Sequence, residues 1–129
     1  MKFVLDTSAY SGFNRGNQKL RAYFKPENAI LVPLIVVGEL RAGFAGGTKK
    51  TENEQLLLRF LDAPNVLAIT ISDATTTMFA NIYSQLRKSG TPIGTNDLWI
   101  AALALEYDMS VLTTDSDFSK INNLKVIQI

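Results

Sequence analysis

The sequence predicts an α/β fold in which helices cover a parallel sheet. Short apolar runs typical of buried strands alternate with segments of helical spacing along all 129 residues. Two of these runs, Phe3–Leu5 and Val111–Thr114, each lead directly into an aspartate, Asp6 and Asp115. Because ligands of open α/β sheets bind beyond the carboxyl ends of the strands, we expect both carboxylates at one cleft.

Five segments have the apolar, β-branched character and the flanking turn residues of strands. They are Lys2–Asp6, Ala29–Val32, Val66–Ile71, Ser110–Thr114 and Lys125–Ile129. A polar, glycine-containing stretch through Gly12 and Gly16 follows the first strand, and helical spacing appears at Leu20, Tyr23 and Phe24.

The remaining segments predict four helices with recognisable start and stop signals. Pro33 suits a first helical turn, and Gly46-Gly47 ends that helix. The next helix runs over Glu52–Leu61, and another is capped by Ser72 or Asp73 and closed by Ser89-Gly90. The last begins at Thr95, is apolar all round and is therefore expected in the interior, and ends near Tyr107-Asp108.

Composition restricts both the architecture and the chemistry. With 47% hydrophobic and 19% charged residues, the chain is expected to form one globular domain over residues 1–129. It contains no cysteine and no histidine, which excludes disulfides, thiolate nucleophiles and the commonest general base. Hydrolytic chemistry would then require carboxylates with a hard cation, or a Ser/Thr/Lys arrangement.

Charge is distributed unevenly along the chain. Residues 1–50 carry eight Lys/Arg against three Asp/Glu, and residues 51–129 carry five against nine. Such asymmetry fits a polyanionic partner, although a solvated basic surface is an equally good interpretation of charge alone. The candidate contacts are Arg15, Lys19, Arg41, Lys49 and Lys50. The N-terminus lacks the pattern of a signal peptide and no apolar run could span a bilayer, so we expect a soluble, cytoplasmic protein without a membrane partner.

Two further carboxylates, Glu39 and Asp97, lie on predicted helices without a cation at any position one turn away. A carboxylate on an apolar strip requires water or a partner from elsewhere in the fold. Glu39 could instead lie on a solvent-exposed edge, and Asp97 could serve only the first helical turn. Similarly, Asp6 could be a helix cap and Asp115 or Asp117 could form a turn.

Convergence of these carboxylates on one crevice would require a counter-ion, since unpaired like charges repel each other. Oxygen-only ligands select Mg²⁺ or Mn²⁺, as one or two ions, over zinc or copper. Such ions activate water and stabilise a leaving oxygen in phosphodiester hydrolysis. Candidate groups that orient the carboxylates or a water are Thr7, Ser8, Asn96 and Thr113, each of which could equally have an ordinary turn, strand or cap role.

Four motifs occur in an order and spacing that resemble the PIN domain, and most closely the VapC-type ribonuclease toxins of bacterial toxin–antitoxin pairs. They are Leu5-Asp6-Thr7-Ser8, Gly38-Glu39-Leu40-Arg41-Ala42-Gly43, Thr95-Asn96-Asp97-Leu98-Trp99-Ile100-Ala101-Ala102, and Leu112-Thr113-Thr114-Asp115-Ser116-Asp117-Phe118. The resemblance covers the whole chain. One departure is Thr114, which stands where relatives commonly carry a basic residue.

The resemblance implies a three-layer αβα sandwich with a central, mainly parallel sheet of four to five strands. It also implies Mg²⁺- or Mn²⁺-dependent cleavage of RNA, with an antitoxin covering the cleft of a homodimer. By position, the catalytic and metal-binding places of the family fall on Asp6, Glu39, Asp97 and Asp115, with Asp117 as an additional acidic residue. Thr113 and Ser8 take its hydroxyl and small polar positions.

Three alternatives remain open from the sequence. A PIN-domain nuclease of RNA maturation, outside any toxin system, would carry the same motifs. A non-catalytic RNA-binding or partner-binding module could keep the acidic pocket as a structural ion site. A haloacid-dehalogenase-type phosphatase also begins with a strand that ends in aspartate, but it needs a second aspartate where this chain has Ser8.

Overall fold

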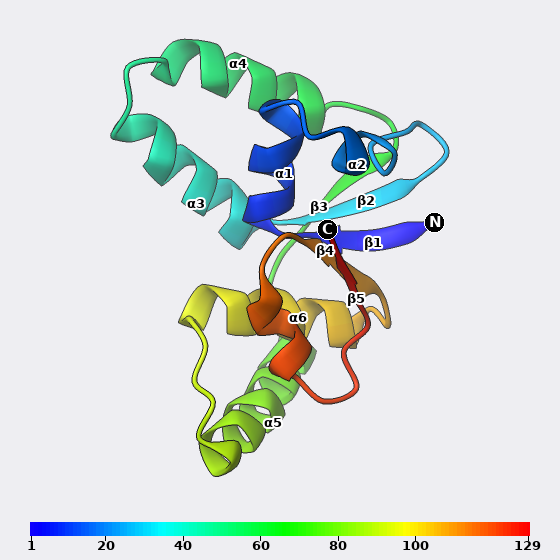
Figure 1. Ribbon diagram of the computed structural model, residues 1–129, viewed down its shortest axis with the longest axis vertical. Helices are drawn as coiled ribbons and strands as arrows, with labels where there is room; N and C mark the ends of the chain where they lie inside the picture. Colours follow the sequence, from blue (N-terminus) through cyan, green and yellow to red (C-terminus); the bar gives the residue numbers. More distant parts are fainter.

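A five-stranded parallel sheet forms the centre of the computed structural model, which describes all residues 1–129 (Figure 1). The strands are β1 (Lys2–Leu5), β2 (Ala29–Pro33), β3 (Val66–Ile69), β4 (Ser110–Thr113) and β5 (Val126–Gln128). Their order is β3-β2-β1-β4-β5, and every neighbouring pair is parallel. The predicted α/β fold with a parallel sheet of four to five strands is therefore confirmed.

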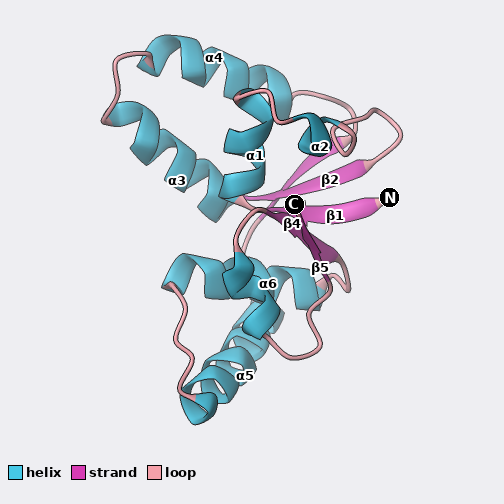
Figure 2. Cartoon of the chain, in the orientation of Figure 1, coloured by secondary structure: helices cyan, strands magenta, loops and turns pink.

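Helices cover both faces of the sheet and complete three layers (Figure 2). The helices α1 (Thr7–Asn14), α2 (Gln18–Arg21), α3 (Leu34–Ala45) and α4 (Lys50–Leu61) lie on one side. The helices α5 (Asp73–Ser89) and α6 (Thr95–Glu106) pack together on the other side. The short 3₁₀ helix η1 (Ser116–Lys120) connects β4 toward β5. No helix has both the length and the apolar character needed to cross a membrane.

Burial on both faces explains why the central strands are continuously apolar. Phe3, Val4 and Leu5 of β1 are fully buried, as are Val111 and Leu112 of the neighbouring β4. A strand that is covered on both sides has no solvent face on which polar residues would alternate. The nearly all-apolar helix α6 contacts β1 and β4 and is buried along most of its length, as its composition predicts.

The polar, glycine-containing stretch after β1 is helix α1, which the sequence pattern did not predict. Gly12 is buried within this helix, and a Cβ built on it would lie 2.5 Å from Cδ1 of Leu20 in α2. The glycine therefore permits close packing between α1 and α2 rather than breaking the helix. Tertiary packing overrides the local propensity at this position.

Helix α2 ends at Arg21, so it is shorter than the helical spacing of Leu20, Tyr23 and Phe24 predicts. Tyr23 and Phe24 lie in the following turn, where Phe24 stacks on Phe13 and Tyr23 meets Phe3 edge to face. Their apolar character reflects packing against the core rather than helical periodicity. The other predicted elements are present, with ends that differ by one or two residues.

The strand order creates a crevice at the carboxyl ends of β1 and β4. From β1 the chain proceeds to β2 and β3 on one side, and then crosses to β4 and β5 on the other. Neighbouring strands whose connections leave in opposite directions form a topological switch point, where open α/β sheets bind ligands. Asp6 follows β1 and Asp115 follows β4, so both are positioned at this point.

Candidate metal centre

Asp6 is held at the end of β1 by hydroxyl groups from two chain segments. Its side chain is only 4% exposed, and Oδ2 accepts hydrogen bonds from Ser8 Oγ (2.6 Å) and Thr113 Oγ1 (2.7 Å). Although Asp6 occupies the N-cap position of α1, its carboxylate makes no capping bond. The carboxylate is therefore oriented by the hydroxyls and not by the helix.

The same two hydroxyls connect Asp6 to the loop that follows β4. Thr113 Oγ1, which is fully buried, accepts the backbone N–H of Asp115 at 2.9 Å. Ser8 Oγ accepts the backbone N–H of Thr114 at 3.0 Å. Each hydroxyl thus donates to Asp6 and accepts from the loop, which fixes Asp6 relative to Asp115.

Glu39 reaches the crevice from α3 and is half-buried. Its Oε1 accepts a hydrogen bond from Thr7 Oγ1 at 2.7 Å, which ties α3 to the start of α1. Glu39 also lines a pocket with Asn96 and Asp97 at the beginning of α6. This places Glu39 opposite α6 rather than on a solvent-exposed edge of its helix.

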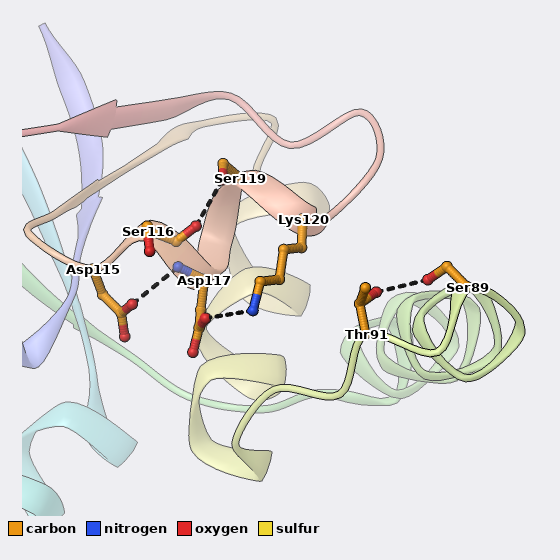
Figure 3. Close-up of polar contacts among 7 residues, drawn as sticks. All are labelled: Ser89, Thr91, Asp115, Ser116, Asp117, Ser119 and Lys120. Atoms are coloured by element: carbon orange, nitrogen blue, oxygen red, sulfur yellow. Dashed lines mark hydrogen bonds and ion pairs between the residues drawn. The ribbon is translucent and has the colours of Figure 1, made fainter.

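Asp97, Asp115 and Asp117 form the tightest group of carboxylates. One oxygen from each lies within 4.8 Å of the others. Asp115 Oδ1 also accepts the backbone N–H of Asp117 at 2.9 Å, so it caps η1 (Figure 3). Its turn-forming role and its place in the acidic cluster are therefore compatible. Asp117 Oδ1 lies 2.8 Å from Lys120 Nζ, which is the only ion pair made by the acidic residues of the crevice.

The electrostatics link this trio to the other two carboxylates. Burial, as the largest cause, and the negative charges of Asp6, Asp115, Glu39 and Asp117, in decreasing order, together raise the pKa of Asp97 to about 7. Burial also raises the pKa of Asp6, against the lowering effect of the Ser8 and Thr113 hydroxyls, and Glu39 adds to the increase. A cation in the crevice would relieve this repulsion.

The donor set fits a hard divalent cation. All candidate ligands are carboxylate oxygens, and the chain offers no histidine or cysteine that would favour zinc or copper. Three carboxylates whose oxygens approach each other within 4.8 Å can share one ion through direct bonds or ion-bound waters. Asp97, Asp115 and Asp117 could therefore bind Mg²⁺ or Mn²⁺, with Asp6 and Glu39 bordering the same crevice.

The other candidate residues lie in two places. Asn96 is exposed beside Asp97 and lines the pocket shared with Glu39. The predicted basic contacts are exposed on the side of the sheet that carries α1 to α4, and Arg41 is already paired with Glu54 at 2.7 Å. Lys120, which pairs with Asp117, is a residue beside the acidic cluster that no sequence pattern singled out. Its spacing of three residues from Asp117 becomes informative only once that segment is known to be helical.

Comparison with known proteins identifies the family. The sequence model described as the PIN domain matches residues 3–124. The chain belongs to the PIN domain family. Ribonuclease VapC of Rickettsia bellii is 31% identical, over 100% of this chain and 97% of the relative. Ribonuclease VapC5 of Mycobacterium tuberculosis is 29% identical, over 98% of this chain and 92% of the relative.

Solved structures show the same relationship for this PIN domain. VapBC2 from Rickettsia felis, in a crystal structure bound to a promoter DNA fragment, gives a TM-score of 0.89 at 26% identity, covering 100% of this chain and 99% of that chain. VapBC-5 from Mycobacterium tuberculosis gives a TM-score of 0.77, also at 26% identity, over 99% and 98% of the two chains. The resemblance to VapC ribonucleases of VapBC toxin–antitoxin systems is confirmed.

Proposed function

We propose that this chain is a single PIN domain that cleaves RNA internally with Mg²⁺ or Mn²⁺ and acts as the toxin of a toxin–antitoxin pair. The observation that carries the proposal is the convergence of Asp97, Asp115 and Asp117 beside Asp6 and Glu39. These residues come from the end of β1, from α3, from α6, from the loop after β4 and from η1, and only folding brings them together. The names of the relatives, which are VapC ribonucleases, support the reaction class.

Each acidic residue has a distinct proposed task. Asp97, Asp115 and Asp117 hold one or two divalent ions, which would activate water and stabilise the leaving oxygen when bound. Asp6, fixed by Ser8 and Thr113, presents its remaining oxygen to the same centre. Glu39 uses Oε1 to accept from Thr7, which leaves Oε2 available to accept a hydrogen bond from the attacking water.

The proposed partners follow from the family. VapBC complexes among the structural neighbours support a cognate antitoxin as the regulatory partner. We propose that the antitoxin covers the acidic crevice and that the toxin acts as a homodimer. The exposed side chains Arg15, Lys19, Lys49 and Lys50 are available to contact RNA, while Arg41 would first have to leave Glu54.

A cleavage assay with matched aspartate variants tests the nuclease. We expect the purified protein to cleave RNA in Mg²⁺ or Mn²⁺ and to stop in EDTA. Asp97→Asn and Asp115→Asn should each reduce the cleavage rate at least about 100-fold, because each substitution removes a charged ligand. The circular dichroism spectra of both variants should match that of the parent. Asp62→Asn, at an exposed position at the end of α4, is the control and should retain full activity. Cleavage that survives both site substitutions would show that the assigned centre is wrong.

Expression experiments separate the toxin from its alternatives. We expect expression of this chain alone to arrest growth and co-expression of its antitoxin to restore it. RNA cleavage without growth arrest would instead indicate an RNA-processing nuclease. Tight RNA binding without turnover in Mn²⁺ would indicate a non-catalytic module.

A further inference from the structure

A groove lined only by polar side chains runs between α5 and the segment that leads from η1 to β5. It is open to solvent, has a volume of about 780 Å³, and its lining contains no hydrophobic and no acidic residue. Two lysines, Lys88 and Lys120, lie in it with hydroxyl and amide side chains around them. Lys120 is paired with Asp117, whereas Lys88 makes no ion pair, so Lys88 supplies the unpaired positive charge of the groove.

Hydrogen bonds between its two walls fix the groove. Gln85 of α5 donates from Nε2 to the carbonyl of Lys120 (3.1 Å), and its Oε1 accepts the backbone N–H of Asn122 (3.0 Å). At the end of α5, Gly90 adopts a φ of 67°, and the hydroxyls of Ser89 and Thr91 lie 2.7 Å apart across it. The groove is therefore built into the fold rather than formed by flexible side chains alone.

Lys120 connects the groove to the candidate metal centre. It lines the groove and pairs with Asp117, whose carboxylate approaches those of Asp97 and Asp115 within 4.8 Å (Figure 3). Figure 3 shows Lys120 between Asp117 and the hydroxyl pair at the end of α5. A polyanion that approaches the acidic centre is repelled by its carboxylates, and cations beside the centre reduce that repulsion.

The chemistry of the lining selects the kind of ligand. Protein partners bind through buried aromatic and apolar anchors, and unpaired bases stack on aromatic rings, but this groove supplies neither. Lysine ammonium groups, hydroxyls and amides are the groups that bind phosphate and sugar oxygens. We propose that the groove holds the sugar–phosphate backbone of the RNA strand on one side of the cleaved bond. This inference rests on the proposed ribonuclease function and assigns the path of its substrate.

A binding experiment with charge-matched variants tests the groove. The parent is the intact chain carrying Asp97→Asn, which prevents turnover, and the probe is a fluorescent single-stranded RNA of about 16 nucleotides. Adding Lys88→Glu should raise the dissociation constant Kd about tenfold. The logarithm of the association constant falls as the logarithm of the salt concentration rises. Adding Lys88→Ala should make this negative slope shallower by about 0.7, as expected for one lost phosphate contact.

Arg59→Glu provides the matched control, because Arg59 is likewise an exposed cation in the last turn of a helix, α4, on the opposite side of the sheet. It should leave both Kd and the salt slope unchanged. The proposal is overturned if Lys88→Glu and Arg59→Glu bind RNA equally well. Circular dichroism and thermal melting of the variants check that their folds are comparable.

Cleavage kinetics separate this proposal from the proposed function. With Asp97 restored, we expect Lys88→Glu to raise KM for RNA about tenfold relative to the Arg59→Glu control. If the unsubstituted protein cleaves RNA but Lys88→Glu keeps its KM, the groove assignment is wrong and the nuclease proposal stands. If the unsubstituted protein binds RNA through Lys88 without cleaving it, the groove stands and the nuclease proposal is wrong.

Discussion

Thr113 shows how one buried hydroxyl can determine the geometry of a charged centre. Its Oγ1 donates to Asp6 and accepts from the N–H of Asp115, so it links the ends of β1 and β4. The bond to Asp6 is buried and the bond from Asp115 is partly buried. An unsatisfied polar group in such a place costs more free energy than the bond itself contributes in water. The position therefore requires a hydroxyl, beyond the β-branched shape that suits a strand.

We predict that Thr113→Val, which keeps the shape of the side chain, lowers the free energy of unfolding by about 1–3 kcal/mol. The loss arises because the Asp6 carboxylate and the Asp115 N–H each lose a buried partner. Urea denaturation measures the change, and Thr114→Val, at the exposed neighbouring position, should stay within about 0.5 kcal/mol of the parent. Equal effects of the two substitutions would contradict the role assigned to Thr113.

The raised pKa of Asp97 predicts how the stability of the metal-free protein depends on pH. Its pKa rises from 3.8 to about 7 on folding, so the folded state binds the proton more tightly than the unfolded state. The contribution of Asp97 to stability is therefore full below about pH 4 and is lost as pH rises through about 7. In EDTA, Asp97→Asn should remove this decline and make the protein more stable at pH 8.

The expected gain of Asp97→Asn at pH 8 is about 1 kcal/mol, which allows for solvent screening of a half-buried group. Thermal melting between pH 4 and pH 8 measures it, and Asp62→Asn should keep the pH profile of the parent. A parallel decline in Asp97→Asn and in the parent would contradict the raised pKa. The pKa of Asp6 is also raised, so Asp6 contributes a decline of the same sign that persists in Asp97→Asn, and the decline there should be smaller than in the parent.

At the scale of elements, the beginning of the chain shows how packing can change the meaning of a residue. Gly12 looks like a helix breaker in the sequence, yet it is the contact point between α1 and α2. Gly38 of α3 has open space where a Cβ would be, so it has no such packing reason to be glycine. Two helical glycines in one chain thus have opposite structural consequences.

We predict opposite signs for alanine at these two positions. Gly12→Ala should destabilise the protein by about 1–3 kcal/mol, because the new Cβ would overlap the buried side chain of Leu20, which would have to move within a packed core. Gly38→Ala should stabilise it by about 0.5–1 kcal/mol, because alanine loses less conformational freedom in a helix. Chemical denaturation of both variants measures the effect, and stabilisation by Gly12→Ala would contradict the close helix contact.

At the scale of the whole molecule, the acidic centre joins the layers of the sandwich. Asp97 is contributed by the side of the sheet that carries α5 and α6, Glu39 by the side that carries α1 to α4, and Asp115 by the loop after β4. Repulsion among these groups opposes the assembly of the layers, and a bound cation would favour it. Metal binding and global stability are therefore expected to be coupled.

We predict that Mg²⁺ or Mn²⁺ raises the melting temperature of the unsubstituted protein at pH 8. At a concentration ten times the dissociation constant, binding adds about 1.4 kcal/mol to the free energy of unfolding, which corresponds to about 5 °C in melting temperature. Differential scanning calorimetry measures the shift, and NaCl at equal ionic strength provides the control. An equal shift in the double variant Asp97→Asn/Asp115→Asn would contradict binding at this centre.

Periodicity and composition reveal the elements because they are local properties. The order of strands and helices follows from apolar runs and turn signals, and α6 is recognisable as an interior helix from its own residues. Helix α1 could not be predicted in this way, since the fit of Gly12 against Leu20 involves a separate helix. The same limit applies to Lys120, whose partner Asp117 lies within reach only in the 3₁₀ turn.

The α/β class, the likeness to the PIN domain and an oxygen-only donor set can be read from the chain alone, because these depend on residue type, order and spacing. Which side chains meet depends instead on tertiary packing. The pairing of β1 with β4 brings Asp6 to Thr113, and the packing of α6 on that pair brings Asp97 toward Asp115 and Asp117. Distances between remote segments depend on how whole layers pack, and no local pattern records that.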